Sequence, residues 1–334
     1  MTIKDLAQKT GYAVGTVSRA LNHHPNVSDT ARETILRVAK ESGFELNINA
    51  KQLKQQRSTA ILAVVKGIGN ELFAQIVEQL QALLAETPYH LAVDYLDEDR
   101  NEVHRAIQLC REKKPLGILF LGGNRHYFAE DFSKIDIPCV LVTNDATGLP
   151  FSNLSSVSMD DRKAAYCAAQ ILIRQGHRQI AMIGGFREVS VTSKLRFEGF
   201  QQALADHKIP FDPEADYRGV RFSYQDGYRA TMALLESGRR FTAIFAAADV
   251  MAIGAIRALG EKGLQVPRDV SVIGIDGITL GDFLVPRLST IQQPTQQIAR
   301  RSIAILRGCI EKRAPACHEI LPFEAKESES ICNI

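Results

Sequence analysis

The side chains that could bind a polyanion gather in the first 57 residues of this 334-residue chain. Nine of the 40 lysines and arginines lie there with only five of the 38 acidic residues, so this segment has a net charge of +4 and the rest has −2. Lysine and arginine neutralise phosphates, and arginine can also pair with a guanine edge through two hydrogen bonds. A basic segment joined to a mildly acidic body is typical of a phosphate-binding module on a globular partner.

Motifs that would carry catalysis or hold a cofactor are missing from the sequence. It has no G-x-x-x-x-G-K-[ST] phosphate loop, no G-x-S-x-G nucleophile elbow and no zincin helix. Gly67 and Gly69 follow an apolar run as in a dinucleotide loop, but Leu72 occupies the third glycine position, which favours an ordinary turn. We therefore expect a protein that is not an enzyme and needs no cofactor.

The cysteines and the apolar runs indicate the compartment. Six cysteines are scattered without a C-x-x-C pair, so we expect reduced thiols and no metal site, although Cys309, Cys317 and His318 lie near one another in the sequence. Lys4 and Asp5 interrupt any apolar leader, and no run approaches the roughly 20 apolar residues of a membrane span. These features predict a cytoplasmic protein with no membrane partner.

Three short amphipathic helices are predicted in the basic segment. Thr2 followed by Asp5 is typical of a capping box at the start of the first helix, and Gly11 allows the positive φ of a tight turn at its end. A second helix at about residues 14–21, and a third that Ser28 can cap, complete a small core. Two helices joined in this way form a helix-turn-helix, which places its second helix in the DNA major groove.

After residue 59, apolar runs alternate regularly with amphipathic helical stretches. The clearest expected strands are 61–65, 91–94, 117–121, 139–142, 180–183, 243–246 and 270–275, and a final strand is expected at 317–322. Helices are expected at 72–86, 161–175 and 250–262. This alternation predicts an α/β fold with two doubly wound parallel sheets in tandem that divide near residue 159. Ligands of such folds bind at the carboxyl ends of the strands, so we expect a cleft between two lobes.

A dense set of short sequences marks the basic segment: Thr16-Val-Ser-Arg-Ala-Leu-Asn22, then Val27-Ser28, then Glu41-Ser-Gly-Phe44. In these positions the segment resembles the DNA-binding head of the LacI/GalR family of bacterial transcription repressors. The resemblance implies contacts to base edges or the adjoining backbone from Val14, Gly15, Thr16 and Arg19, and contacts to phosphates from Thr2, Ser18, Asn22 and Ser28. It also implies a hinge helix that orders on DNA, with contacts from Asn47, Ala50, Lys51 and Leu53, the last as a minor-groove wedge.

Two positions of the head depart from the family's pattern. Ala13 stands where a serine usually caps the second helix, and loss of a cap costs about 1 kcal/mol. Gly15 stands where a base-reading side chain is usual, so Arg19 and Val14 are expected to supply more of the sequence preference. The other interpretations are a three-helix protein-interaction module without a DNA role and an ordinary linker at residues 47–54.

The body carries further short sequences, among them Asp160-Asp-Arg-Lys-Ala-Ala-Tyr166, Arg196-Phe-Glu-Gly-Phe200, Asp249-Val-Met-Ala-Ile-Gly-Ala255 and Ile275-Asp276. They are similar to the sensor domain of the same family, which is itself similar to periplasmic sugar-binding proteins. Position by position, the resemblance implies an effector pocket formed by Phe73, Asp160, Thr192, Arg196, Phe222, Asp249 and Asp276. Carboxylates and a guanidinium can pair with vicinal hydroxyls while an aromatic face covers a sugar ring, so a sugar is the expected effector.

Several of these pocket residues have a structural alternative. Asp160 and Asp276 could be helix caps or ion-pair partners, and Phe73 and Phe222 could be core residues. Three departures from the family also blur the effector: Lys66-Gly67, Ala248 and Gly277 replace residues that are usual there. A phosphorylated sugar or another small metabolite therefore stays open.

The resemblance also implies partners and a division of the chain. A homodimer is expected to bind double-stranded, pseudo-palindromic operator DNA, with a small-molecule effector in the cleft. We expect a head at 1–45, a hinge at 46–57 and an effector-binding and dimerisation domain at 58–334. Its N-subdomain would span about 58–159 and 290–320, and its C-subdomain about 160–289 and 321–330. The alternatives are a sugar-binding protein, a Rossmann-type enzyme and a corepressor-dependent regulator of non-sugar metabolism.

Overall fold

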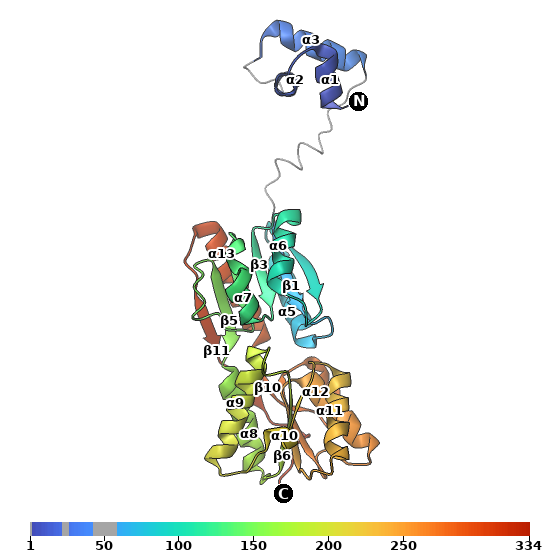
Figure 1. The fold of residues 1–334 in the computed structure, drawn as a ribbon, viewed down its shortest axis with the longest axis vertical. Coiled ribbons are helices and arrows are strands. Elements are labelled where there is room, and N and C mark those ends of the chain that lie inside the picture. The colour runs from blue at the N-terminus through green and yellow to red at the C-terminus, as the bar shows by residue number, and fades with distance from the viewer. Residues whose placement is uncertain (1, 22–26, 43–58) are drawn as a thin grey trace. The chain divides into compact units, whose positions relative to one another are not determined.

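The computed structural model describes residues 2–21, 27–42 and 59–334, and the chain forms two compact units, Met1–Arg57 and Ser58–Ile334 (Figure 1). Five of the residues predicted to contact DNA lie outside the described residues: Asn22, Asn47, Ala50, Lys51 and Leu53.

Three helices make up the described part of the first unit: α1 (Ile3–Thr10), α2 (Val14–Leu21) and α3 (Asp29–Glu41). The predicted capping box begins α1, because the Asp5 amide donates to Thr2 Oγ1 at 3.3 Å and the Thr2 amide donates to Asp5 Oδ2 at 2.7 Å. Gly11 follows α1 with a φ of 74°, as the predicted turn requires. The three helices share a core whose fully buried members include Leu6, Val17 and Ile35.

The other two helices begin without a side-chain cap. Ser28 occupies the N-cap position of α3, as predicted. Its side chain makes no capping hydrogen bond, so the predicted side-chain cap is wrong. Ala13 has no side-chain acceptor to offer α2, and its carbonyl oxygen accepts from the amides of Thr16 and Val17 at 2.8 and 3.0 Å. Helix α1 therefore has the side-chain cap that α3 lacks.

Replacing Thr2 by alanine is expected to destabilise the head by about 1 kcal/mol, the usual value of an N-cap side chain. Hydrogen exchange of the α1 amides in the full chain measures this loss. Thr30→Ala is the matched control, because Thr30 is exposed in the first turn of α3 and its side chain caps nothing. Equal protection factors in the two variants would contradict a stabilising role for the box.

The first lobe of the second unit is built on a sheet with the order β11-β5-β4-β3-β1-β2, in which all neighbours are parallel. Its strands are β1 (Ala60–Lys66), β2 (His90–Leu96), β3 (Gly117–Leu121), β4 (Cys139–Val142), β5 (Leu154–Met159) and β11 (His318–Leu321). One face packs against α5 (Glu71–Leu84) and α13 (Thr295–Lys312), and the other against α6 (Glu102–Lys113) and α7 (Arg125–Asp131).

The second lobe has a sheet with the order β12-β10-β9-β8-β6-β7, parallel except for the edge strand β12. Its strands are β6 (Ile180–Gly184), β7 (Tyr217–Gly219), β8 (Ala243–Ala246), β9 (Ser271–Asp276), β10 (Ser289–Gln292) and β12 (Glu324–Lys326). The helices pack in pairs, α8 (Asp161–Arg174) with α9 (Val191–Asp206), and α11 (Tyr224–Glu236) with α12 (Asp249–Glu261). Two doubly wound sheets are therefore confirmed.

Four strands were not predicted, β5, β7, β10 and β12, and β5 shows why. It reads Leu-Ser-Ser-Val-Ser-Met, which lacks the apolar run of a central strand, yet all six residues are buried. Two of its three serine hydroxyls accept from backbone amides: Ser156 Oγ from the Ala146 amide at 3.0 Å, and Ser155 Oγ from the Cys317 amide at 3.2 Å. Buried hydroxyls that are hydrogen-bonded in this way replace apolar side chains at low cost.

The chain passes between the two lobes three times, after β5, after β10 and after β11. The expected return to the first lobe at about residue 290 comes slightly too early, because Ser289–Gln292 still pair with β9. These three connecting segments lie between the two sheets. A change in the angle between the lobes therefore has to change the backbone conformation of these segments.

Candidate functional site

The core of the head leaves one face of α2 open. The buried residues of this helix are Val17, Ala20 and Leu21. Val14 is 43% exposed, Gly15 and Arg19 are exposed, and Thr16 and Ser18 are partly exposed. The five α2 residues that the sequence assigned to DNA therefore lie at the surface, where a duplex could reach them.

Arg19 and Gly15 lie next to each other on this face. Arg19 Nε donates to the Gly15 carbonyl oxygen at 3.1 Å, so the side chain lies back along the helix. Packing does not require glycine at position 15, because an added Cβ would meet no atom within 4 Å. The glycine instead leaves bare backbone at the start of α2, where a DNA strand can approach closely.

Thr2 and Ser28 stand at the N-cap positions of α1 and α3, and both are exposed. A helix N-terminus carries partial positive charge and unpaired amides, which suit a phosphate. The predicted phosphate contact thus has a physical basis at Ser28, whereas at Thr2 the Asp5 carboxylate already occupies the start of α1 and accepts from the Thr2 amide.

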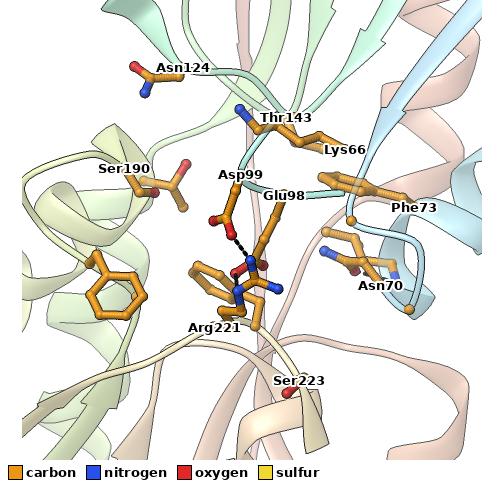
Figure 2. A pocket seen from close by; sticks show the side chains of 18 of the residues that line it. Lys66, Asn70, Phe73, Glu98, Asp99, Asn124, Thr143, Ser190, Arg221 and Ser223 are labelled. Carbon is orange, nitrogen blue, oxygen red and sulfur yellow. Dashed lines mark hydrogen bonds and ion pairs between the residues drawn. The ribbon is translucent and has the colours of Figure 1, made fainter. Parts of the chain in front are cut away.

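A cavity of ≈ 530 Å³ lies between the two lobes of the second unit (Figure 2). Its walls come from the loops after β1, β2, β3 and β4 in the first lobe and after β6, β7, β9 and β10 in the second. This is the edge at which the strands of both sheets present their carboxyl ends, as the topology requires for a ligand site.

Five of the seven residues predicted for the pocket line this cavity: Phe73, Thr192, Arg196, Phe222 and Asp276. Asp160 does not, because it caps α8, where its Oδ1 accepts from the Lys163 amide at 3.0 Å and its Oδ2 pairs with Lys163 Nζ at 3.1 Å. Asp249 does not line the cavity either, and it is fully buried behind the wall. For Asp160 the structure therefore favours the helix-cap interpretation.

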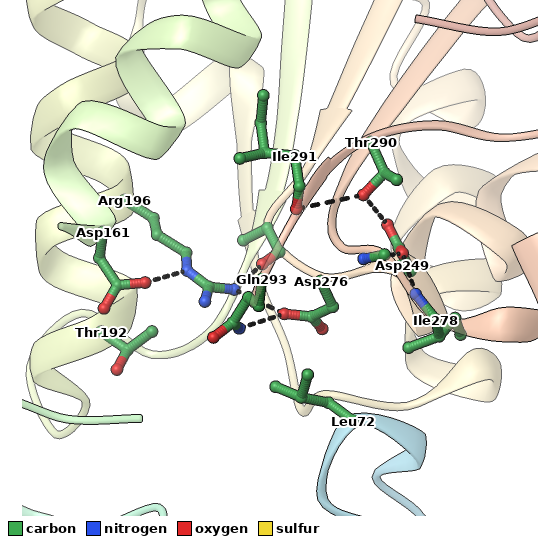
Figure 3. Close-up of polar contacts among 12 residues, drawn as sticks. Leu72, Asp161, Thr192, Arg196, Asp249, Asp276, Ile278, Thr290, Ile291 and Gln293 are labelled. Atoms are coloured by element: carbon green, nitrogen blue, oxygen red, sulfur yellow. Dashed lines mark hydrogen bonds and ion pairs between the residues drawn. The ribbon is translucent and has the colours of Figure 1, made fainter. Parts of the chain in front are cut away.

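Arg196 is the centre of a buried charged cluster at one wall of the cavity (Figure 3). Its Nε donates to Asp161 Oδ1 at 2.7 Å, its Nη1 lies 3.6 Å from Asp276 Oδ1, and it also donates to the Ala247 carbonyl oxygen. Gln293 Nε2 donates to the same Asp276 oxygen at 2.8 Å. The carboxylate that holds Arg196 is thus Asp161, one residue beyond the predicted Asp160.

Asp249 holds the loop that carries Asp276. The amides of Gly277 and Ile278 donate to Asp249 Oδ2 at 2.7 and 2.9 Å, and the Thr290 hydroxyl donates to Oδ1 at 2.7 Å. Gly277 has a φ of 74°, and a Cβ there would lie 2.5 Å from the Gln292 side chain. Asp249 is therefore a positioning residue for the cavity wall.

Three carboxylates, those of Asp161, Asp249 and Asp276, surround this one guanidinium. Burial raises the pKa of all three above the usual range of an aspartate, and Arg196 opposes the rise by favouring their charged forms. The nearby carboxylates raise the pKa of Arg196, so the guanidinium stays charged. The cluster has three carboxylates and one guanidinium, so a single positive charge cannot neutralise all three.

Replacing Asp276 by asparagine is expected to raise the melting temperature at about pH 8 and to flatten its pH dependence. A carboxyl with a raised pKa stabilises the fold most below its ordinary pKa of 3.8, and this stability is lost as the pH rises through the raised value. Asparagine keeps the shape and cannot ionise. Melting curves across this pH range measure the effect.

Asp131→Asn is the control with the opposite sign. Lys134 holds the pKa of Asp131 below its ordinary value, so the unaltered chain gains stability from this carboxylate as the pH rises, and the variant is expected to lack that gain. If the melting temperature of Asp276→Asn depends on pH in the same way as that of the unaltered chain, Asp276 does not have a raised pKa in the folded protein.

Lys66 is a cavity residue whose role the sequence did not reveal. Its Nζ lies 2.6 Å from Glu102 Oε2 and 5.0 Å from the centre of the Tyr127 ring, and Glu102 is fully buried. The Asn124 amide donates to the other Glu102 oxygen at 2.5 Å. Lys66 departs from the family's pattern, but Glu102 has the sequence context of an ordinary acidic residue at the start of a helix.

Arg221 joins the two lobes across the mouth of the cavity (Figure 2). It follows β7 in the second lobe and lies 3.3 Å from both Asp97 Oδ1 and Glu98 Oε1 of the first lobe, and it also pairs with Asp99. Two neutral hydrogen bonds also join the lobes, Asn144 to Thr192 at 2.8 Å and Gln75 to Thr279 at 3.1 Å. These contacts hold the lobes together in this conformation.

Within the described part of the chain, no group of His, Cys, Asp and Glu residues is arranged to hold a metal ion, and the six cysteines are unpaired. Burial raises the pKa of the Cys139 thiol, which disfavours its reactive thiolate form. In the same residues no helix is long and apolar enough to cross a membrane.

Comparison with known proteins shows a likeness that extends over both units. Residues 2–47 match the family "Bacterial regulatory proteins, lacI family", and residues 169–331 match "Periplasmic binding protein-like domain". The HTH-type transcriptional regulator MalR of Clostridium butyricum is 34% identical over 337 residues, which cover 100% of both chains. The HTH-type transcriptional repressor CytR of Escherichia coli K12 is 32% identical and covers 91% of this chain and 88% of its own.

A solved structure agrees with these relatives. The transcriptional regulator CelR in complex with cellobiose has a TM-score of 0.71 to this chain at 26% identity, and the match covers 99% of each chain. Both the helical head and the two-lobed body are therefore shared with transcriptional regulators over the whole length. The chain belongs to the lacI family of bacterial regulatory proteins.

Proposed function

We propose that this chain is a ligand-responsive transcription repressor that binds a pseudo-palindromic operator as a homodimer. One chain combines an open helix-turn-helix face with an inter-lobe cavity. A transcriptional regulator matches this chain over its full length, and this combination supports the proposal. As a DNA-binding regulator it acts on the bacterial chromosome, in the cytoplasm. We assign the cavity a regulatory role rather than a catalytic one, because the relatives are regulators.

Operator recognition follows from the head. We place α2 in the major groove with Arg19 and Val14 at base edges, and Thr2, Ser18 and Ser28 at the phosphates. Two heads in a dimer would read two half-sites about one helical turn apart, or a multiple of it. Because phosphate contacts release counterions, the affinity should fall steeply with salt concentration.

The response to effector follows from the cavity. Phe73 comes from the first lobe, whereas Arg196, Phe222 and Asp276 come from the second, so a bound ligand contacts both. A ligand that prefers one angle between the lobes shifts the protein toward that angle. If the two angles differ in how well the heads can dock, ligand and DNA affinities become coupled, and the coupling is reciprocal. A corepressor would have the same linkage with the opposite sign.

The two modules can be separated by experiment. A variant that lacks residues 1–57 is expected to lose all operator binding and to keep ligand binding, because the second unit is compact by itself. Operator binding is measured by fluorescence anisotropy, on DNA that the full chain selects from a random pool. Ligand binding is measured by calorimetry. A full chain that selects no sequence at low salt would disprove the proposed repressor.

A further inference from the structure

We propose that Arg187 is a positioning residue for effector binding, which fixes the loop between β6 and α9 in the wall of the cavity. This loop spans residues 185–190. Four of its residues line the cavity: Gly185, Phe186, Val189 and Ser190. Arg187 does not line the cavity, so it can act on a ligand only through its neighbours. The inference rests on the proposed function and adds a residue that controls effector affinity from outside the cavity.

One turn and one helix cap organise the backbone of the loop. The amides of Val189 and Ser190 donate to the Phe186 carbonyl oxygen at 3.3 and 3.0 Å, which closes the turn. Ser190 then caps α9, where its Oγ accepts from the Ser193 amide at 3.2 Å. The two apolar side chains of the loop are largely exposed, Phe186 to 48% and Val189 to 59%. Side chains as exposed as these bury little apolar surface, so they contribute little to holding the loop in place.

Arg187 lies over two aromatic rings of the second lobe. Its guanidinium carbon is 4.1 Å from the centre of the Phe197 ring and 4.8 Å from the centre of the Tyr217 ring. The two rings meet edge to face, with their centres 5.1 Å apart. A guanidinium this close to a ring face is attracted by the ring electrons, and more strongly where it is partly buried, as Arg187 is. Among the described residues no carboxylate forms an ion pair with Arg187, so the rings are what hold its charge.

These two rings belong to elements that build the cavity wall. Phe197 follows Arg196 directly on α9, and Tyr217 is the first residue of β7. Both rings are core residues, with 6% and 8% of their surface exposed. The Tyr217 hydroxyl also donates to the Gly185 carbonyl oxygen at the start of the loop. Arg187 thus attaches the middle of an exposed loop to two side chains that the core holds in place.

The attachment of Arg187 determines where its neighbour Phe186 lies. The Phe186 ring lies beside Gly219 of β7, where an added Cβ would be 3.6 Å from a ring atom. A loop that is already held in its binding conformation does not have to be ordered when a ligand arrives. If the loop takes this conformation for only a fraction of the time, the apparent dissociation constant rises by the inverse of that fraction. Loss of one arginine–aromatic stack changes such a population by about fivefold.

Hydrogen exchange of the full chain without any ligand tests the positioning directly. The Val189 and Ser190 amides close the turn, so their protection reports on the loop. Arg187→Gln is expected to reduce this protection about fivefold, and Arg187→Lys should restore only part of it, because an ammonium lacks the flat face of a guanidinium. Arg257→Gln is the control, since Arg257 is exposed on α12, pairs with Glu261 at 3.4 Å and does not line the cavity. Equal protection in Arg187→Gln and Arg257→Gln would overturn the proposal.

The consequence for effector binding is measured by titrating six sugars into the full chain on its selected operator: glucose, galactose, ribose, maltose, cellobiose and lactose. For every sugar that acts, Arg187→Gln should raise the half-effective concentration by the same factor of about five, because the fraction of competent loop is a property of the free protein. The operator affinities without sugar and at saturation should not change. An unchanged half-effective concentration, or an altered affinity at saturation, would overturn the proposal. A panel in which no sugar acts contradicts the proposed effector response instead, and the exchange measurement without ligand then still decides on Arg187.

Discussion

Replacing Arg19 by alanine is expected to remove most of the repressor's preference for its operator over random DNA. A good bidentate contact to a base is worth about 1–3 kcal/mol, and a dimer makes the contact twice, so the loss is about 2–6 kcal/mol. The effect is large because Gly15 presents no side chain on the same face, and among the neighbouring groups Val14 can offer only apolar contact. Anisotropy titrations with selected and scrambled DNA give the specificity ratio.

Arg37→Ala provides the control for charge alone. Arg37 lies on α3, where it is exposed and pairs with Glu41 at 3.3 Å, so the variant loses the same charge from the same head without touching α2. Arg37→Ala is expected to weaken binding to selected and to scrambled DNA equally, because it reduces only the salt-dependent attraction to phosphates. If Arg19→Ala also weakens both DNAs alike, Arg19 is a phosphate contact and the proposed base reading is wrong.

Replacing Arg196 by lysine is expected to abolish the response to effector while operator binding persists. The guanidinium pairs with Asp161 and Asp276 and donates to the Ala247 carbonyl, and a lysine ammonium cannot satisfy all three from one point. The wall that should hold the ligand hydroxyls would lose its geometry, at a cost in binding of about 2 kcal/mol or more. Operator titrations with and without the effector measure the response.

Arg239→Lys is the matched control for this substitution. Arg239 donates to both oxygens of Asp216, at 2.6 and 2.9 Å, and does not line the cavity. The variant thus breaks a bidentate arginine–aspartate pair at another place in the second lobe, and it should respond to effector normally. Melting curves of both variants separate a lost response from a lost fold. A normal response in folded Arg196→Lys would remove Arg196 from the proposed site.

The sequence allowed the sheets to be predicted because central parallel strands are buried on both faces and read as apolar runs, as Gly117–Leu121 does. It missed β5, in which the buried Ser155 and Ser156 accept hydrogen bonds from backbone amides that are distant in the sequence. It also missed the edge strands β7 and β12, which have three residues each, too few to form a pattern. Long-range pairing, not local propensity, forms these elements.

The partners of the charged residues around the cavity also depend on long-range contacts, which the sequence does not show. Asp160 and Asp161 are adjacent, and only the start of α8 decides that the first caps the helix while the second reaches Arg196. Lys66 and Glu102 are 36 residues apart, and no local pattern joins them. Residue types thus indicated the chemistry of the pocket, whereas the partner of each charge depended on the fold.

We propose that the inter-lobe cavity and the operator-binding head are coupled. The operator affinity of the full chain, measured by anisotropy on DNA selected from a random pool, is compared without ligand and at saturation with the tightest-binding sugar. We expect a change of about 5- to 150-fold, and a change of the same factor in sugar affinity when operator is bound. A sugar that binds the cavity and leaves the operator affinity unchanged would contradict it.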